Sequence, residues 1–462
     1  MADRIKLREK IGYGFGDMAS SMFWKLFSIY LLFFYTDVFG IAAAAVGTMF
    51  LITRIWDTLF DPVVGVISDR TKSRWGKFRP YLLYVSIPFG IIGVLTFTVP
   101  SFTGTGLLVY AYITYSLMMM IYSLINVPYA ALLGVISADP KQRNILASFR
   151  MAFAFIGSLI ALALIEPLVN IFSKKAGGIV DARSGWQLAV MVIAALCVAI
   201  FMLCFSWVKE RVYPLKAEKS SLKNDVRDLI RNRPWWILLG AGVAALIFNS
   251  IRDGAALYYF KYVIQSTEAF KLGTTVITWS TLYLTVGQAA NIIGVILASS
   301  IANKVGKKKT FLLAMGVASG LSIIFFWLNS HQIMLIFVFQ FFISICAGII
   351  FPLLWSMYAD IVDYSEWKTG RRATGLVFSS SSMSQKLGWT IGGALTGWLL
   401  GAIGFKANVV QGSSVQLGIR LMLSFLPAAG ALISVFFISL YPLSEKRVIE
   451  IAGELEEKRK SV

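Results

Sequence analysis

Two acidic residues, Asp57 and Asp61, stand four positions apart in an otherwise apolar segment of the chain. Four residues make about one turn of an α-helix, so the two carboxylates share a face with Cβ atoms about 5–6 Å apart. Carboxylates this close in a poorly hydrated cavity resist being ionised together, and a proton or metal cation relieves the repulsion. The pair is typical of an exchangeable cation site. The alternative is a purely structural ion pair between Asp57 and Arg54, three positions earlier.

A lysine in another polar stretch is the natural partner of this pair. Lys386 follows the serine-rich run 379–384 and stands far from both ends of its apolar segment. A charge at the bilayer centre costs about 3 kcal/mol, so the ammonium group needs a carboxylate partner. We expect a salt bridge from Lys386 to Asp57 or Asp61 that substrate or cation loosens. Snorkelling of Lys386 to a membrane surface is the alternative.

The first apolar segment carries a polar stripe that suits a sugar. Asp17, Ser21 and Lys25 recur every four residues, with Trp24 beside them. Sugars present hydroxyl groups at their edges and apolar C–H faces, so charged hydrogen-bonding groups beside an aromatic ring form a site for them. Trp389 adds a second ring in the lysine-bearing segment, although a tryptophan in a membrane protein is more often an interfacial anchor.

Other apolar segments contain further polar side chains. The segment with Tyr122 also contributes Asn126, which is predicted to offer an amide oxygen to a cation or hydrogen bonds to a ligand, and the next segment contributes Arg150. Arg252 and Asp253 are interpreted equally well as a structural pair or as functional groups. Three more charged residues near segment ends are interpreted as structural: Glu166, Lys261 and Arg420.

These residues require helices that cross a membrane. Of the 462 residues, 57% are hydrophobic and only 15% are charged, whereas about a quarter are charged in soluble proteins. Three cysteines, all in apolar runs, and one histidine exclude a disulfide framework and a zinc cluster. About twelve apolar segments are each long enough to cross about 30 Å of hydrocarbon. They are 11–38, 45–69, 80–99, 107–137, 145–172, 186–208, 234–265, 276–302, 309–329, 332–360, 374–402 and 416–442.

The distribution of basic residues predicts the orientation of the chain. Of the 43 Lys and Arg residues, 31 fall at the termini and in the loops after segments 2, 4, 6, 8 and 10, where Lys309 at the boundary of segment 9 is counted with the loop before it, and five fall in the other loops. Basic loops face the cytoplasm, so we expect both termini there. The net charge of +19 therefore reflects topology and not nucleic-acid binding. We expect a multi-pass protein of the cell membrane, in bacteria the inner membrane.

A basic linker divides the chain after the sixth segment. The loops after segments 2 and 8 are both short and basic, and Asp139 and Asp360 follow alanines at equivalent places after segments 4 and 10. Parallel six-helix repeats that hold a substrate at mid-membrane are a transporter architecture. The alternative is that the loops of the two halves are similar only because their charges set the membrane topology. The fold class is an all-α membrane protein. Its expected parts are two six-helix halves, 1–208 and 234–442, a cytoplasmic linker, 209–233, and a cytoplasmic tail, 443–462.

Several of these stretches together resemble one family. The runs Gly12-Tyr-Gly-Phe-Gly-Asp17, Arg54-Ile-Trp-Asp57-Thr-Leu-Phe-Asp61 and Asn126-Val-Pro-Tyr129, with Ala359-Asp-Ile-Val-Asp-Tyr364 and Lys386, resemble the glycoside-pentoside-hexuronide:cation symporters of the major facilitator superfamily. The resemblance covers the whole chain, in order. It implies the major facilitator fold and import of a glycoside or related sugar, coupled to a cation that moves down its gradient.

The resemblance also implies roles for single residues. Asp57 and Asp61 match the family's cation-binding pair, Lys386 matches a lysine near that pair, and Arg150 matches an arginine at the substrate cavity. A further set matches an inner gate whose charges tie the halves together when the outside is open: Asp360, Asp363 and Arg372.

The chain departs from the melibiose-permease pattern of this family at three positions. Ser21 stands in place of a sugar-binding aspartate, Asn126 in place of a carboxylate, and Ala130 in place of a tryptophan. One carboxylate fewer neutralises a metal cation less well, so we favour coupling to a proton over coupling to sodium at Asp57 and Asp61. We expect no cofactor and no other metal.

Two other functions would use some of the same residues. A drug-efflux antiporter of the same superfamily would respond to a lipophilic cation as competitor and not to a sugar. A membrane-embedded enzyme with Asp57 and Asp61 as catalytic acids on a lipid-linked sugar would need polar outer loops, and these loops are short. We therefore expect no enzyme, and a monomer whose partners are a small sugar and the bilayer. The choice among hexuronide, pentoside and hexoside stays open.

Overall fold

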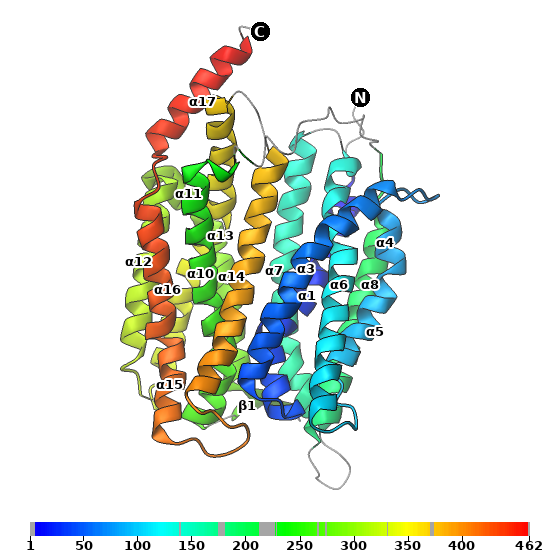
Figure 1. Cartoon of the computed structure of the whole chain (residues 1–462), viewed down its shortest axis with the longest axis vertical. Helices are drawn as coiled ribbons and strands as arrows, with labels where there is room; N and C mark the ends of the chain where they lie inside the picture. Colours follow the sequence, from blue (N-terminus) through cyan, green and yellow to red (C-terminus); the bar gives the residue numbers. More distant parts are fainter. Residues whose placement is uncertain are drawn as a thin grey trace. The chain divides into compact units, whose positions relative to one another are not determined.

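The computed structural model describes residues 5–137, 140–173, 181–211, 227, 229–265, 268–272, 275–329, 331–369 and 374–460. These residues form helices and their connections, with one antiparallel two-stranded hairpin (Figure 1). Contacts within the chain define two compact units. Unit 1 comprises Met1–Ala217, Ser266–Thr285 and Leu400–Val410, and unit 2 comprises Glu218–Gln265, Val286–Leu399 and Gln411–Val462.

Unit 1 begins with a long helical stretch that contains two π-helical turns. It consists of α1 (Leu7–Lys25), η1 (Leu26–Tyr30), α2 (Leu31–Phe33) and η2 (Phe34–Phe39). The following helices are α3 (Ala43–Arg70), α4 (Arg79–Tyr84), α5 (Ser86–Thr96), α6 (Thr105–Ile136), α7 (Pro140–Ser173) and α8 (Ala182–Trp207). The hairpin of β1 (Glu268–Leu272) and β2 (Thr275–Thr278) also belongs to unit 1, and Phe270 pairs with Ile277 in it.

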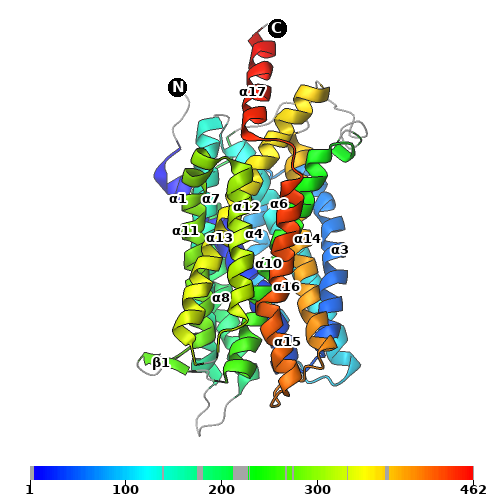
Figure 2. The same cartoon turned by 90° about the vertical axis from the view of Figure 1, so that its left-hand side faces the viewer.

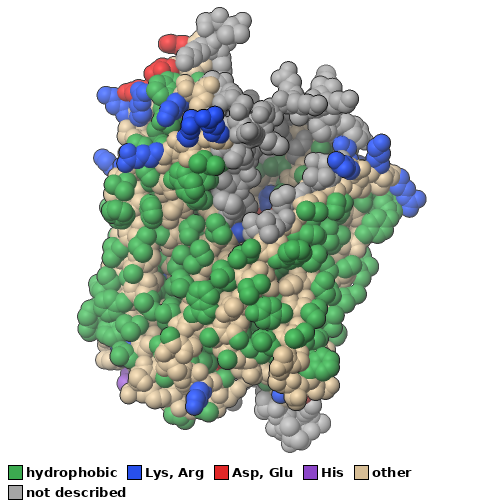
Figure 3. All heavy atoms as spheres, in the orientation of Figure 1, with side chains coloured by type: hydrophobic (Ala, Val, Ile, Leu, Met, Phe, Trp, Pro, Cys, Tyr) green, Lys and Arg blue, Asp and Glu red, His purple; other side chains and the backbone are tan. Residues whose placement is uncertain are grey.

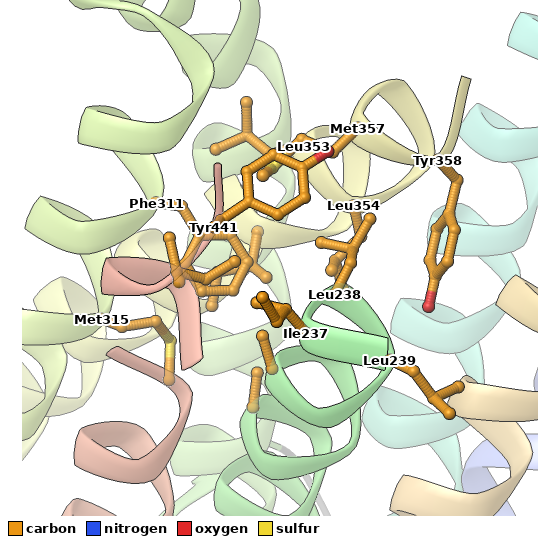
Figure 4. Close-up of a cluster of buried hydrophobic side chains, with 14 of the residues drawn as sticks. Ile237, Leu238, Leu239, Phe311, Met315, Leu353, Leu354, Met357, Tyr358 and Tyr441 are labelled. Carbon is orange, nitrogen blue, oxygen red and sulfur yellow. The ribbon is translucent and has the colours of Figure 1, made fainter. Parts of the chain in front are cut away.

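Unit 2 is built from the remaining helices. They are α10 (Arg233–Tyr258), η3 (Tyr259–Ile264), most of α11 (Trp279–Val305), α12 (Lys307–Phe325), α13 (Ile333–Thr369), α14 (Thr374–Ala402), α15 (Ser413–Leu423), α16 (Phe425–Ser439) and α17 (Glu445–Lys460). Helix α12 contacts both α13 and α16 (Figure 2). Buried side chains of α10, α12 and α13 form the core of this unit, together with Tyr441 (Figure 4).

Each expected membrane segment is helical in the structure. The segment expected at 45–69 is α3, and the segment expected at 416–442 is divided into α15 and α16. Among the described residues, nine helices are long and apolar enough to cross a membrane. Helices α3, α5 and α14 are not among them: α3 carries three charges near its middle, α5 has 11 residues, and α14 is rich in serine. The chain is therefore a helical membrane protein, and the number of twelve spans stays a prediction.

Glycines allow the closest helix contacts in each unit. A Cβ atom added at Gly157 of α7 would lie 2.3 Å from the carbonyl oxygen of Met18 of α1. In unit 2, a Cβ at Gly294 of α11 would lie 2.1 Å from the carbonyl oxygen of Ile345 of α13. Small residues are the usual means by which helix backbones approach each other in lipid. The α1–α7 contact brings the polar faces of these helices within hydrogen-bonding distance.

The surface agrees with a membrane environment. Figure 3 shows apolar side chains over the flanks of the helices, with Lys and Arg side chains gathered at the helix ends near α17 and near the loop before α4. Such a distribution is expected for helices surrounded by hydrocarbon, because charged groups lie in the polar interface.

Candidate functional site

An ion pair joins α1 to α7 in unit 1. Arg150 donates from Nε to Asp17 Oδ2 at 2.7 Å and from Nη2 to Asp17 Oδ1 at 3.5 Å. The Arg150 head group also lies 5.1 Å from the centre of the Tyr129 ring. The Arg150 side chain is 31% exposed and the Asp17 side chain is 17% exposed. A two-point pair that solvent reaches can exchange one of its bonds for the hydroxyl group of a ligand.

Helix α6 is held to α1 beside this pair. Tyr129 donates its hydroxyl to the carbonyl oxygen of Tyr13 at 2.6 Å. Ser20 donates to the side-chain oxygen of Asn126 at 2.7 Å, and the Asn126 side-chain nitrogen donates to the carbonyl oxygen of Tyr122 at 3.0 Å. The amide oxygen of Asn126 therefore already accepts a hydrogen bond, and its role in cation binding stays a prediction.

The carboxylate of Asp57 is buried between α3 and α6. Its side chain is 1% exposed, and Ser123 donates its hydroxyl to Asp57 Oδ1 at 2.7 Å. Arg54 Nη1 lies 3.8 Å from Asp57 Oδ2, which is longer than a hydrogen bond. The Arg54 head group lies 4.4 Å from the centre of the Trp24 ring, within the range of a cation–π contact. The ion pair considered as the structural alternative is thus present, and Arg54 also links Asp57 to α1.

The other predicted residues of unit 1 lie on the same helices. Asp61 follows Asp57 by one turn of α3 and is partly exposed. Ser21 follows Asp17 by one turn of α1, and Lys25 is next to Trp24; both are partly exposed. The Trp24 and Tyr122 rings have centroids 5.6 Å apart. Direct contacts join these side chains in two groups: Asp17 with Arg150, and Trp24 with Tyr122, Asn126 and, through Arg54, Asp57.

Lys386 and Trp389 lie on α14 in unit 2, and both are partly exposed. The backbone carbonyl of Lys386 accepts the hydroxyl of Thr390 at 2.6 Å. The carboxylates of α3 belong to unit 1. The salt bridge expected between Lys386 and these carboxylates stays a prediction.

The predicted inner gate lies at the end of α13. Lys307, the first residue of α12, donates to both carboxylate oxygens of Asp360, at 2.7 and 2.8 Å. Asp363 is partly exposed one turn further along α13, and Arg372 lies outside the described residues. Asp360 is therefore bound within unit 2 in this structure, and the expected role of these charges in tying the halves together stays a prediction.

The sequence does not predict the contacts made by four side chains: Ser20, Ser123, Arg252 and Lys307. Ser123 and Ser20 are serines in apolar helices, and no local pattern distinguishes them from other serines. Arg252, for which a structural pair with Asp253 and a functional role are equally open from the sequence, donates to the carbonyl oxygen of Leu423 at 2.6 Å and to Gln340 at 2.8 Å. Lys307 stands in the short basic loop after segment 8, where its charge was attributed to topology.

Comparison with known proteins decides the family. A model of the family described as MFS/sugar transport protein matches residues 12–445. The chain belongs to this family. The resemblance inferred from the motifs of α1, α3, α6 and α13 is thereby confirmed.

Relatives align along the whole chain. This MFS/sugar transport protein is 36% identical over 454 residues to the putative glycoside/cation symporter YagG of Escherichia coli (strain K12), with 98% of this chain and 95% of that protein covered. It is 34% identical over 454 residues to the isoprimeverose transporter of Lactiplantibacillus pentosus, covering 97% and 91%. Its fold is similar, with a TM-score of 0.67 and 12% identity, to a crystal structure of a bacterial homologue of the human lysosomal transporter Spinster, covering 96% and 97%.

Proposed function

We propose that this protein imports a glycoside or related sugar across the bacterial inner membrane, coupled to a proton, by alternating access. One observation carries the proposal. The buried carboxylate of Asp57 is connected, through Arg54 and Trp24, to the helix that bears the partly exposed Asp17–Arg150 pair. A cation site and a sugar site that share α1 allow the occupancy of one to influence the other. The names of the relatives, a putative glycoside/cation symporter and an isoprimeverose transporter, support the substrate class and exclude no particular sugar.

The proposed topology has twelve spans in two six-helix halves, with both termini in the cytoplasm and a monomer as the working unit. The basic linker and the positions of the 43 Lys and Arg residues support it. In the proposed cycle the two halves rock about a substrate held at mid-membrane. The predicted salt bridge of Lys386 with the α3 carboxylates is part of this cycle.

The sugar contacts are proposed to centre on α1, α6 and α7. Arg150 and Asp17 offer a charged donor and a charged acceptor to neighbouring sugar hydroxyls. The rings of Trp24 and Tyr122, 5.6 Å apart, offer apolar faces for the C–H groups of a pyranose. Ser21 and Lys25 extend the polar stripe along α1, and Trp389 is proposed as a second aromatic contact.

Coupling is proposed to act through Asp57 and Asp61. Neutralisation of this pair from outside removes a repulsive charge, raises the affinity for sugar, and permits the change of conformation. Because coupling between binding sites is reciprocal, bound sugar must raise the affinity for the cation by the same factor. The charges of Asp360, Asp363 and Arg372 are proposed to close the inner side in the outward-open state.

The number of oxygen ligands that each ion needs, and the hydrogen bonds already made by two oxygen atoms, support a proton as the coupling ion. Sodium, a hard cation, needs several oxygen ligands, whereas a proton needs one carboxylate oxygen. The Asn126 oxygen accepts the Ser20 hydroxyl, and Asp57 Oδ1 accepts the Ser123 hydroxyl.

Uptake into proteoliposomes tests the proposal. The purified protein is supplied with a panel of labelled glycosides, neutral and anionic, under an imposed proton gradient or an imposed sodium gradient. We expect at least one glycoside to accumulate above equilibrium when the proton gradient is present. Failure of every glycoside to accumulate under either gradient would contradict the proposal, and accumulation under sodium alone would overturn the choice of ion.

A further inference from the structure

Glu166 is an acid of α7 that the proposed sugar and cation sites do not use. Its carboxylate accepts hydrogen bonds from three hydroxyl groups: Tyr30 at 3.3 Å, Ser280 at 2.9 Å, and Thr278. The residue is partly buried inside unit 1. A carboxylate in a membrane-spanning helix is costly without partners, and hydrogen bonds to an ionised group are stronger than those between neutral groups. The sequence indicates only a structural acid near the end of its segment, whereas in the structure Glu166 accepts hydrogen bonds from three particular hydroxyl groups.

Thr278 connects Glu166 to the start of α11. Its hydroxyl oxygen accepts the backbone N–H of Thr281 at 3.1 Å, the contact made by a helix N-cap residue. It also lies 2.9 Å from the hydroxyl oxygens of both Ser280 and Thr281, and Thr281 is 3% exposed. A negative charge beside a helix N-terminus is further stabilised by the helix dipole. Glu166 thus binds the first turn of α11 through two hydroxyl groups and through its charge.

The chain passes from unit 1 to unit 2 within α11, about two turns after its first residue. The chain leaves unit 2 after Gln265, remains in unit 1 from Ser266 to Thr285, and re-enters unit 2 at Val286. Because Thr278 and Ser280 both donate to Glu166, the first turn of α11 (Trp279–Val305) is held against α7. The hairpin that precedes α11 lies at the end of unit 1 remote from the N-terminus (Figure 1), which is the outer end in the proposed topology.

A second segment passes between the units in the same way. Leu400–Val410, which begins in the last turn of α14, belongs to unit 1. In it, Asn408 donates from its side-chain nitrogen to the carbonyl oxygen of Asp37, at the end of η2, at 2.6 Å. The proposed topology places this loop on the outer side too. Two outer loops are therefore bound to unit 1, one through a neutral amide and one through the carboxylate of Glu166.

We infer that Glu166 is a gating residue of the transport cycle. Glu166, Thr278 and Ser280 form a contact that we name the outer latch. The latch holds the first turn of α11 against α7, and in the proposed cycle its two hydrogen bonds break when the outer side opens to admit sugar. The inference rests on the proposed alternating-access transport, since such a transporter must open and close its outer side in every cycle.

Hydrogen–deuterium exchange of the full-length protein in lipid nanodiscs tests the outer latch directly. Glu166→Ala removes the acceptor, and Ser280→Ala removes one donor while leaving the helix cap at Thr278 in place. We expect amide exchange in residues 279–285 to rise about tenfold in Glu166→Ala, the factor that corresponds to about 1.4 kcal/mol. The rise in Ser280→Ala should be smaller, and it keeps the test informative if Glu166→Ala fails to fold.

Tyr30→Phe is the matched control. Tyr30 also donates to Glu166, but it lies on η1 and is not part of the segment that passes between the units. Its loss should leave exchange in the first turn of α11 at the wild-type level. An equal rise in Tyr30→Phe and Glu166→Ala would indicate a purely structural acid and overturn the inference. Unchanged exchange in both Glu166→Ala and Ser280→Ala would overturn it as well.

Measuring the affinity for sugar on the outer side distinguishes a failure of the outer latch from a failure of the proposed function. A weakened latch increases the outward-open population, so Ser280→Ala should bind external sugar severalfold more tightly. If exchange rises in the latch variants and the wild-type protein transports no glycoside, the gating role stands and the sugar assignment fails. If wild-type protein transports a glycoside and the latch variants match it in exchange and in external affinity, the transport function stands and the latch fails.

Discussion

Two arginines inside membrane-spanning helices, Arg150 of unit 1 and Arg252 of unit 2, have opposite surroundings. Arg150 has a side chain that is 31% exposed, and its partner is the partly exposed carboxylate of Asp17. Arg252 is 4% exposed, and it donates to a backbone carbonyl and to the Gln340 side chain, which are neutral and fixed. Its partial exposure and its partly exposed partner make Arg150 better suited than Arg252 to contact a ligand.

The difference has a cause in the helices of unit 2. Helix α15 ends at Leu423, where Ser424 departs from helical geometry, and the end of a helix leaves carbonyl groups without intrahelical donors. In hydrocarbon such groups need a donor, and Arg252 supplies one to Leu423. Arg420 does the same for the end of α12, donating to the carbonyl oxygen of Phe326 at 2.6 Å. Arg252 and Arg420 of unit 2 therefore donate to carbonyl groups at helix ends, whereas Arg150 of unit 1 forms an ion pair with Asp17.

The largest effect is expected from Arg150→Lys. Lysine keeps the positive charge but cannot make the two-point contact with Asp17. We expect sugar uptake to fall about 100-fold, equivalent to about 2.7 kcal/mol, with the melting temperature in detergent unchanged. Initial uptake rates and thermal unfolding of the same preparation measure both. Wild-type uptake by this variant would remove Arg150 from the sugar site.

Arg252→Met should lower the stability of the protein, whereas Arg150→Lys should lower its sugar uptake. The change leaves the Leu423 carbonyl and the Gln340 amide without their donor in a buried site, so we expect a loss of about 3 kcal/mol of stability. Thermal unfolding in detergent checks the result, and Gln340→Ala, which leaves the Leu423 contact intact, should lose less. Normal stability together with abolished uptake would place Arg252 in a ligand site and remove the contrast between the units.

A smaller effect is expected from Asn126→Asp. Ser123, which donates to Asp57, and Asn126 lie three positions apart on α6. Residues at this spacing share a helix face, so a carboxylate at position 126 would lie close to the Asp57 carboxylate. An added negative charge favours a metal cation, and we expect sodium to stimulate uptake severalfold in this variant. Asn126→Ala, which adds no charge, is the control and should stay insensitive to sodium. Sodium dependence of the unchanged protein would contradict the choice of a proton.

The sequence predicts the helices well because their signal is local. Each apolar run is long enough to be recognised alone, and the division near residue 424 is missed because both sides of it are apolar. The Asp57 and Asp61 pair is likewise found because both residues stand on one helix. The contacts of Arg150 with Asp17 and of Ser123 with Asp57 join residues 133 and 66 positions apart, so only the packing of helices reveals them.

The interpretation of Glu166 and Arg252 shows the limit of local patterns. Both are single charges in apolar runs, and the sequence shows neither the hydroxyl groups that gather around Glu166 nor the helix end that Arg252 completes. Their partners lie in the chain more than 70 positions away. Exposure and partner chemistry, which separate a site from a structural contact, are properties of the folded chain.

The central claim, that the α3 carboxylates couple sugar movement to a cation, is tested most directly with Asp61→Asn in proteoliposomes. Asparagine is close in size to aspartate and carries no charge, so the conformational cycle should proceed without the coupling ion. We predict that accumulation against a sugar gradient disappears under an imposed proton gradient, while exchange of labelled for unlabelled sugar at equilibrium continues. Accumulation at the wild-type level in this variant would contradict the account.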